Sequence, residues 1–394
     1  MSRRAPIALM VAVVLAAGSA AACSSSGKGG GGGTGSGTAP ATSGGTATGG
    51  GGGSGKAAAQ ARVDALLKAP TSINITTPVS KKPAAGKTIA LVESAEPVTI
   101  KTNDGFRAAA KAIGWTVKTV QEGSGPEDPA KAFGQAIDMH PDAICITGNP
   151  LSTMRAQVAR AKAAKIPVIQ SDAGEPAGQD GSIYTLSLDN FVQTGAWGNM
   201  IADYISTKGS KHTLVVDLSV YPILHAFSTA VVKQLKTVSP STKTTILDTQ
   251  ISDLAGGKIA GNIVSQVQRN PDIDWVILAL GDMATGLDAA LRGAGLANKV
   301  KIGGESASTA NITALKKNQQ AVWTGFAAAI HGWRRIDALV RIFNGDSLDP
   351  NNNSKLPTQL LTPDNVKQAT LDPDGYYVGV PDYQTQYKKL WLVG

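Results

Sequence analysis

Cysteine is scarce in this chain of 394 residues, which contains only Cys23 and Cys145. Cys23 lies in the segment SAAACSSSGKGG, which has too little apolar surface to fold. Cys145 lies in PDAICITG, an apolar segment that predicts a buried strand. No disulfide framework of the kind found in small secreted domains is therefore expected. The folded part must be stabilised by its hydrophobic core, and Cys145 is expected to be a free, buried thiol.

Motifs for catalysis and metal binding are also missing. The sequence contains no H-E-x-x-H, C-x-x-C or G-x-S-x-G motif. The four histidines show no metal-ligand spacing; they are His140, His212, His225 and His331. The chain carries a net charge of +8, but its Lys and Arg residues are scattered and its aromatic content is only 5%. We therefore expect no enzyme, no metal, no cofactor and no nucleic-acid partner.

Long hydrophobic runs are absent as well. The apolar run 7–17 is shorter than the roughly 20 residues that span a membrane. Arg3 and Arg4 precede this run and small residues follow it, so residues 1–22 are predicted to be a signal peptide. The sequence SAAAC resembles a lipobox, in which the cysteine becomes the first mature residue and carries lipid. A plain secretory signal is the alternative, and the export route, general or twin-arginine, stays open.

The residues after Cys23 are dominated by Gly, Ser, Thr and Ala. Such a composition cannot bury enough apolar surface to fold, so 23–55 is predicted to be a lipidated cysteine followed by a disordered tether. A Gly-rich chain of this length has a root-mean-square span of about 30 Å. The segment 56–86 contains a short helical pattern and then an extended stretch. It either caps the folded domain or only precedes it.

From Lys87 onward, apolar strand patterns alternate with helical patterns. This alternation predicts an α/β fold with two doubly wound parallel-sheet lobes, joined by a multi-strand hinge. We assign 87–190 plus 327–350 to the first lobe and 191–326 plus 372–394 to the second. In open parallel sheets, ligands bind beyond the carboxyl ends of the strands. The cleft between the lobes is therefore the expected ligand site.

The order of several segments resembles the type I periplasmic binding proteins of ABC importers, especially ribose-binding-like sugar and autoinducer receptors and their lipid-anchored actinobacterial relatives. The segments are AKAAKIPVIQSD, SLDN, NPDIDWVILALGDMATGLDAALRGAGL, KVKIGGES, LTPDNV and YKKLW. This resemblance implies a lipoprotein anchored to the outer face of the cell membrane. It would capture a small molecule and deliver it to an ABC permease, and we expect it to be a monomer.

The ligand residues of the resembled family match poorly. Where sugar-binding members carry Asp-Arg after the fourth strand, this chain has Asp172 and Ala173. His225 is nearest to the position of a second arginine, Asp282 follows the strand that usually ends in Asn-Asp, and Glu305 replaces the aspartate of a G-x-D motif. A hinge glutamine becomes Phe326. Both arginines and both amides of the usual sugar clamp are therefore absent.

The candidate ligand-binding residues are Ser94, Glu96, Asn149, Asp172, Tyr221, His225, Asp282, Glu305 and Phe326. Leu280 and Trp323 would add apolar surface. This set favours a ligand with few hydroxyls, or one with a cationic or hydrogen-bond donor group, because the acids can accept hydrogen bonds from such a group. Each acid could instead cap a helix or face solvent, and each aromatic residue could belong to the core. We expect the carboxylate of Asp172 to be unpaired without ligand.

Three functions stay open at this stage. The first is a solute-binding lipoprotein of an ABC importer. The second is a ligand-sensing lipoprotein that signals to a membrane partner. The third, an exported enzyme, would need a nucleophile and base that the sequence does not show.

Replacing the lipidated residue tests the anchoring prediction. The substitution Cys23→Ser should move the protein from the membrane fraction to the soluble fraction, because the thiol that carries the lipid is lost. Fractionation and immunoblotting measure the distribution, with Cys145→Ser as the control. A Cys23→Ser protein that stays on membranes would contradict the prediction.

Overall fold

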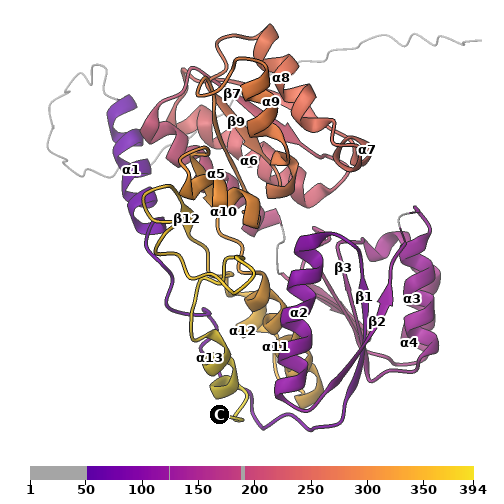
Figure 1. Ribbon diagram of the computed structural model, residues 1–394. Helices are drawn as coiled ribbons and strands as arrows, with labels where there is room; N and C mark the ends of the chain where they lie inside the picture. Colours follow the sequence, from indigo (N-terminus) through magenta and orange to yellow (C-terminus); the bar gives the residue numbers. More distant parts are fainter. Residues whose placement is uncertain (1–50, 124, 188–190) are drawn as a thin grey trace, which may run out of the picture. The chain divides into compact units, whose positions relative to one another are not determined.

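The computed structural model describes residues 51–123, 125–187 and 191–394. The predicted signal peptide, Cys23 and most of the predicted tether lie outside the described residues. The folded part contains two six-stranded sheets, each with helices packed on it, and this confirms the predicted two-lobe α/β fold (Figure 1).

The first lobe has the strand order β2-β1-β3-β4-β6-β5. All neighbouring strands are parallel except β5 and β6, which form an antiparallel edge. The central strands are buried on both faces, as their continuous apolar sequences predict. The strands are β1 (Thr88–Glu93), β2 (Thr116–Gln121), β3 (Ala143–Thr147), β4 (Val168–Ser171), β5 (Gly178–Asp180) and β6 (Ile183–Thr185).

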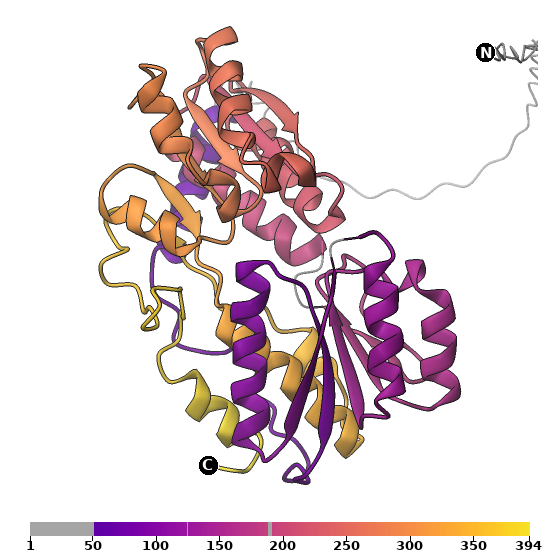
Figure 2. The same cartoon turned by 45° about the vertical axis from the view of Figure 1, so that its right-hand side comes forward.

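Helices cover both faces of this first sheet. Helices α2 (Pro97–Ala112) and α11 (Ala328–Asn344) lie on one face, and α3 (Asp128–Asp138) and α4 (Arg155–Ala163) lie on the other (Figures 1 and 2). The contact between α2 and α11 requires glycine. A Cβ atom on Gly332 would lie 2.2 Å from the carbonyl oxygen of Thr102. The two backbones can therefore approach more closely than side chains would allow.

The second lobe has the strand order β12-β11-β10-β9-β7-β8, with only β12 antiparallel to its neighbour. The strands are β7 (His212–Asp217), β8 (Lys243–Asp248), β9 (Trp275–Leu278), β10 (Lys301–Gly304), β11 (Val322–Thr324) and β12 (Leu360–Leu361). The helices are α5 (Phe191–Lys208), α6 (Pro222–Val238), α7 (Ile251–Ala255), α8 (Ile259–Arg269), α9 (Leu287–Gly293) and α10 (Thr309–Lys316). A short 3₁₀ turn at Gly281–Ala284 belongs to this lobe, and another at Leu151–Thr153 lies in the first lobe, between β3 and α4. Helix α5 packs on α6, and α8 packs on α9.

The carboxyl-terminal helix differs from the sequence-based assignment. Helix α13 (Tyr383–Leu390) was expected in the second lobe, but it packs against α11 of the first. Trp391, directly after α13, stacks on Trp333 with ring centroids 5.3 Å apart. Its indole Nε1 donates to Oδ1 of Asp337 at 2.9 Å. Helix α11 thus offers Trp391 an aromatic face together with a buried acceptor. The assignment of 372–394 to the second lobe was therefore wrong for this helix.

The segment before Lys87 contacts both lobes. Helix α1 (Gly51–Leu66) packs on α5, and Arg62 Nε and Nη2 donate to the two carboxylate oxygens of Asp203 at 2.6 and 2.8 Å. Farther along, Val79 N donates to the carbonyl of Leu390 at 3.0 Å on the first-lobe side. This segment caps the folded part rather than only preceding it. Because α1 begins at Gly51, the predicted tether overlaps the start of this helix.

The capping segment should contribute to stability. Its side chains Val63, Ile73, Ile75 and Val79 are at most 4% exposed. Burial of each such side chain is worth about 1.5–3 kcal/mol, and each kcal/mol corresponds to roughly 2–4 °C in a domain of 150–250 residues. A chain starting at Lys87 should therefore melt at a clearly lower temperature than one starting at Gly51. Differential scanning calorimetry measures the difference, and equal melting temperatures would show that the segment is dispensable.

Candidate functional site

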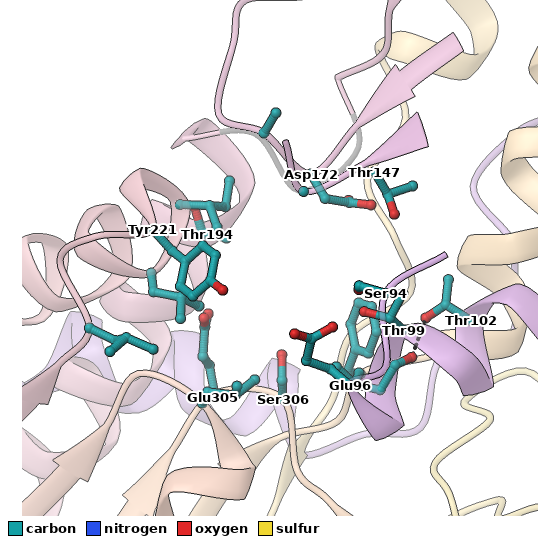
Figure 3. Close-up of a pocket in the computed structure, with 18 of the residues that line it drawn as sticks. Ser94, Glu96, Thr99, Thr102, Thr147, Asp172, Thr194, Tyr221, Glu305 and Ser306 are labelled. Atoms are coloured by element: carbon teal, nitrogen blue, oxygen red, sulfur yellow. Dashed lines mark hydrogen bonds between the residues drawn. The ribbon is translucent and has the colours of Figure 1, made fainter. Parts of the chain in front are cut away.

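A cavity of about 260 Å³ lies where carboxyl ends of strands from both sheets meet. Parallel strands place the residues that follow them at one edge of a sheet, so each lobe contributes one edge to the cavity. Figure 3 shows Asp172, Glu96, Tyr221 and Glu305 around this common space. The lining residues that directly follow strands are Ser94, Glu122, Gly148, Asp172, Leu218 and Glu305.

Seven of the nine candidate residues line this cavity. They are Ser94, Glu96, Asn149, Asp172, Tyr221, Glu305 and Phe326. Leu280, expected to add apolar surface, lines it as well. Their role in ligand binding stays a prediction, but their location agrees with the rule that ligands bind beyond the carboxyl ends of parallel strands.

His225 and Asp282 do not line the cavity. His225 Nδ1 lies 2.6 Å from Oδ2 of Asp217, a fully buried carboxylate at the end of β7. Asp217 also accepts hydrogen bonds from Ser228 Oγ and the backbone N–H of Leu218. A buried carboxylate needs several donors, and this need explains the position of the imidazole. Asp282 lies in the 3₁₀ turn Gly281–Ala284, where burial raises the pKa of its carboxyl.

Trp323 is part of the core rather than the cavity. It is fully buried in β11, and its indole Nε1 donates to Oε1 of Gln320 at 2.7 Å. A buried indole needs an acceptor for its N–H, and Gln320 supplies one inside the second lobe. The alternative that this aromatic residue belongs to the core is therefore the correct one.

Asp172 is paired within the protein. Its φ of 63° places it in the left-handed region, directly after β4. Ser171 Oγ donates to its Oδ2 at 2.8 Å, and Nε2 of His331 lies 3.0 Å from its Oδ1. Burial alone would raise the pKa of Asp172, but His331, the Arg335 guanidinium and Ser171 together lower it. The expectation of an unpaired carboxylate at this position was wrong.

His331 and Arg335 reach the cavity from α11, one helical turn apart. Burial lowers the pKa of His331, and the guanidinium groups of Arg335 and Arg334 lower it further. The carboxylate of Asp172 raises this pKa but offsets the lowering only in part. Arg335 Nη1 donates to Oδ1 of Asn103 at 3.1 Å and lies 3.7 Å from the Sγ atom of Cys145. Sequence reasoning missed both residues, because nothing local marks this face of α11 as facing Asp172.

A group of acids lies at another part of the cavity. Glu122 directly follows β2 and was not predicted as a site residue. Asn149 Nδ2 donates to its Oε2 at 2.9 Å and to its Oε1 at 3.1 Å. Burial raises the pKa of Glu122, the Asn149 bond opposes this, and the carboxylate of Glu96 raises it further. Burial and the same two glutamates raise the pKa of Tyr221, so these three groups act on one another.

The rest of the wall is mainly apolar. Trp197 and Phe326 form an edge-to-face pair with centroids 6.1 Å apart, and the His331 ring lies 5.6 Å from Phe326. Aliphatic side chains complete this surface: Val98, Leu218, Ile223, Leu224, Ile251, Leu254 and Leu280. The hydroxyl groups come from Ser94, Thr99, Thr102, Thr147, Thr194 and Ser306. Such a wall suits a ligand with a substantial apolar surface.

The carboxylates of this cavity can accept hydrogen bonds but cannot donate them when ionised. Within the described ranges, no group of three or more His, Cys, Asp or Glu residues is placed to hold a metal ion. In the same part of the chain, no helix combines the length and apolarity needed to cross a membrane.

Residues 88–347, about two thirds of the chain, match the family model of the periplasmic binding protein domain. The chain belongs to this family. The order of the two sheets and the cavity between their carboxyl edges are consistent with that membership. The resemblance to type I periplasmic binding proteins is thereby confirmed. A comparison with curated proteins finds no significant match.

Solved structures of similar fold include several proteins with bound solutes. A solute-binding protein from Actinobacillus succinogenes with bound D-allose is 17% identical, with a TM-score of 0.60, covering 72% of this chain and 100% of its own. A Mycobacterium smegmatis protein in complex with β-D-fucofuranose is 16% identical, with a TM-score of 0.59 and coverage of 78% and 98%. A carbohydrate transporter from Acidothermus cellulolyticus in complex with myo-inositol is 21% identical, with a TM-score of 0.57 and coverage of 72% and 96%. At these identities the likeness shows the fold alone.

The pairing of Asp172 predicts a cost in stability. Asp172→Ala would leave His331 and Arg335 without their carboxylate neighbour, and a lost buried polar partner costs about 1–3 kcal/mol. The midpoint of urea unfolding should fall accordingly. Asp282→Ala is the matched control, because burial already opposes the ionised form of that carboxylate. Equal effects of the two substitutions would argue against a structural role for the Asp172 pairing.

Proposed function

We propose that this protein is an extracytoplasmic solute-binding lipoprotein, which captures a small molecule in the cavity between its lobes and delivers it to an ABC importer. The observation that carries the proposal is the cavity itself. It is lined by the carboxyl edges of two separate parallel sheets, so a ligand bound there contacts both lobes. Membership of the periplasmic binding protein family supports an extracytoplasmic role.

The connections between the lobes support a hinged capture mechanism. The chain leaves the second lobe after β11 and enters α11 of the first, and it returns to the second lobe before β12. These two crossings run beside each other, since Gly325 N donates to the carbonyl of Gln359 at 2.8 Å. When two domains close on a ligand, the backbone dihedral angles of a few connecting residues change and the domains move as rigid bodies. Phe326 lies in one of these connections and also lines the cavity.

The proposed lipid anchor and the proposed permease partner rest on the sequence that precedes the folded part. Lipid on Cys23 would hold the protein at the outer face of the membrane, and the Gly-rich residues after it would let the folded part reach a permease.

The cavity contains Glu96, Glu122, Asp172 and Glu305 but little of an amide-rich sugar clamp. The captured solute is therefore proposed to be small and less hydroxylated than a typical sugar.

Ligand capture can be tested with the folded chain from residue 51 onward, which keeps the capping segment. Native mass spectrometry of the purified protein should reveal a co-purified small molecule, and unfolding should release it. The released compound should then bind the refolded protein in titration calorimetry with one molecule per chain. Tyr221→Ala should weaken binding roughly tenfold or more, since aromatic anchors of this kind cost over 1 kcal/mol on truncation. A protein that carries and binds no solute would overturn the proposal.

A further inference from the structure

The charged groups in the cavity are unevenly distributed. Its described lining contains four carboxylates, Glu96, Glu122, Asp172 and Glu305, and two basic side chains, His331 and Arg335. Both basic side chains come from α11 and act on Asp172. Figure 3 shows Glu96 and Glu305 at other parts of this space. Glu122 also lines the cavity, and its carboxylate interacts with that of Glu96.

The Asp172 end combines a carboxylate with two basic side chains. Arg335 is permanently charged, and its charge acts on the ionised carboxylate of Asp172. His331 is buried beside the same carboxylate, with its Nε2 3.0 Å from Oδ1 of Asp172. The carboxylate at this end is therefore already compensated by basic side chains of the protein.

The end formed by Glu96, Glu122 and Tyr221 has a net negative charge. The Glu122 carboxylate accepts hydrogen bonds from the neutral amide of Asn149. Glu96 is exposed just before α2. Among the described lining residues, no basic side chain other than those at the Asp172 end is available to compensate these glutamates. Glu305, only 1% exposed on the second lobe, adds a further carboxylate to the wall.

Capture of a solute here would remove water from these carboxylates. Taking an ionised carboxylate out of water is costly unless an opposite charge or several donors replace the water. A neutral apolar solute supplies neither. A cationic solute supplies the missing charge, and the electron-rich faces of Tyr221, Trp197 or Phe326 also attract cations.

We propose that the cavity selects small organic cations, either protonated amines or quaternary ammonium compounds, with a largely apolar body. The cationic group lies at the end formed by Glu96, Glu122 and Tyr221, and the apolar body lies against the aliphatic and aromatic wall. This inference rests on the proposed capture function, and it adds the chemical class of the solute. Glu122 is then the residue that sets the preference for charge, because it is half-buried at the cavity wall.

Matched pairs of solutes test this preference. Choline and 3,3-dimethylbutan-1-ol differ in one atom, nitrogen against carbon, and benzylamine and benzyl alcohol differ in the charged group. Titration calorimetry should show that each cation binds at least tenfold more tightly than its neutral partner. Stronger or equal binding of the neutral partners, or of D-allose or myo-inositol, would overturn the inference and leave the capture function standing. If none of these solutes binds, the charge of the co-purified compound at pH 7 decides: a cation supports the inference and a neutral or anionic compound overturns it.

Isosteric substitutions test which residues determine the preference for a cationic solute. Glu122→Gln keeps the shape of the side chain and an oxygen for Asn149 but removes the negative charge. It should weaken binding of the cation about tenfold, which corresponds to about 1.4 kcal/mol, and leave the neutral partner unchanged. Glu127→Gln is the matched control, because Glu127 lies nearby in the sequence, is exposed and pairs with Lys131 outside the cavity.

The two proposals fail in different ways. Unchanged cation affinity in both Glu122→Gln and Glu96→Gln would show that the charge of these residues does not select the solute. Absence of any co-purified compound and of binding by every probe would instead remove the capture function. Circular dichroism melting of each variant establishes that a loss of affinity comes from a folded protein.

Discussion

Helix α11 is buried along almost its whole length although it carries several charged side chains, and much of the structure depends on how these charges are paired. Asp337 accepts hydrogen bonds from Arg341 Nε, Asn351 Nδ2 and Trp391 Nε1 at 2.8–3.0 Å. Arg341 also donates to the carbonyl of Thr77 at 2.7 Å. Buried charges are tolerated only when they are paired and hydrogen-bonded. This requirement holds the capping segment and the carboxyl-terminal helix against the first lobe.

The same helix connects the core to the cavity. Its first turns present His331 and Arg335 beside Asp172, and its later turns carry the Asp337 network. The backbone contact at Gly332 fixes the distance between α11 and α2, because any side chain there would collide with α2. The Asp172 end of the cavity is therefore part of a rigid, packed region. The glutamates at the other end follow β2 or precede α2, and Glu96 remains exposed.

Conservation of the fold and divergence of the ligand residues are compatible in this protein. Solved structures with bound sugars or polyols share the fold at only 16%, 17% and 21% identity. The strand ends define where a ligand can bind, whatever side chains they carry. Exchange of the side chains at these ends, such as Glu305 for an aspartate, alters the chemistry of the cavity without altering its place. The ligand class must therefore be argued from the cavity and not from the fold.

The sequence by itself determined the two-lobe fold and the approximate position of the site. Alternating strand and helix patterns are local, and the residue after a parallel strand must lie at the ligand edge, so Asp172 and Glu305 were placed correctly in the cavity wall. Only the tertiary structure decided which partners the polar groups have. His225 pairs with Asp217, and the Trp391 indole bonds to Asp337 across the chain. Such partners depend on distances between elements far apart in sequence, which no local pattern of residues contains.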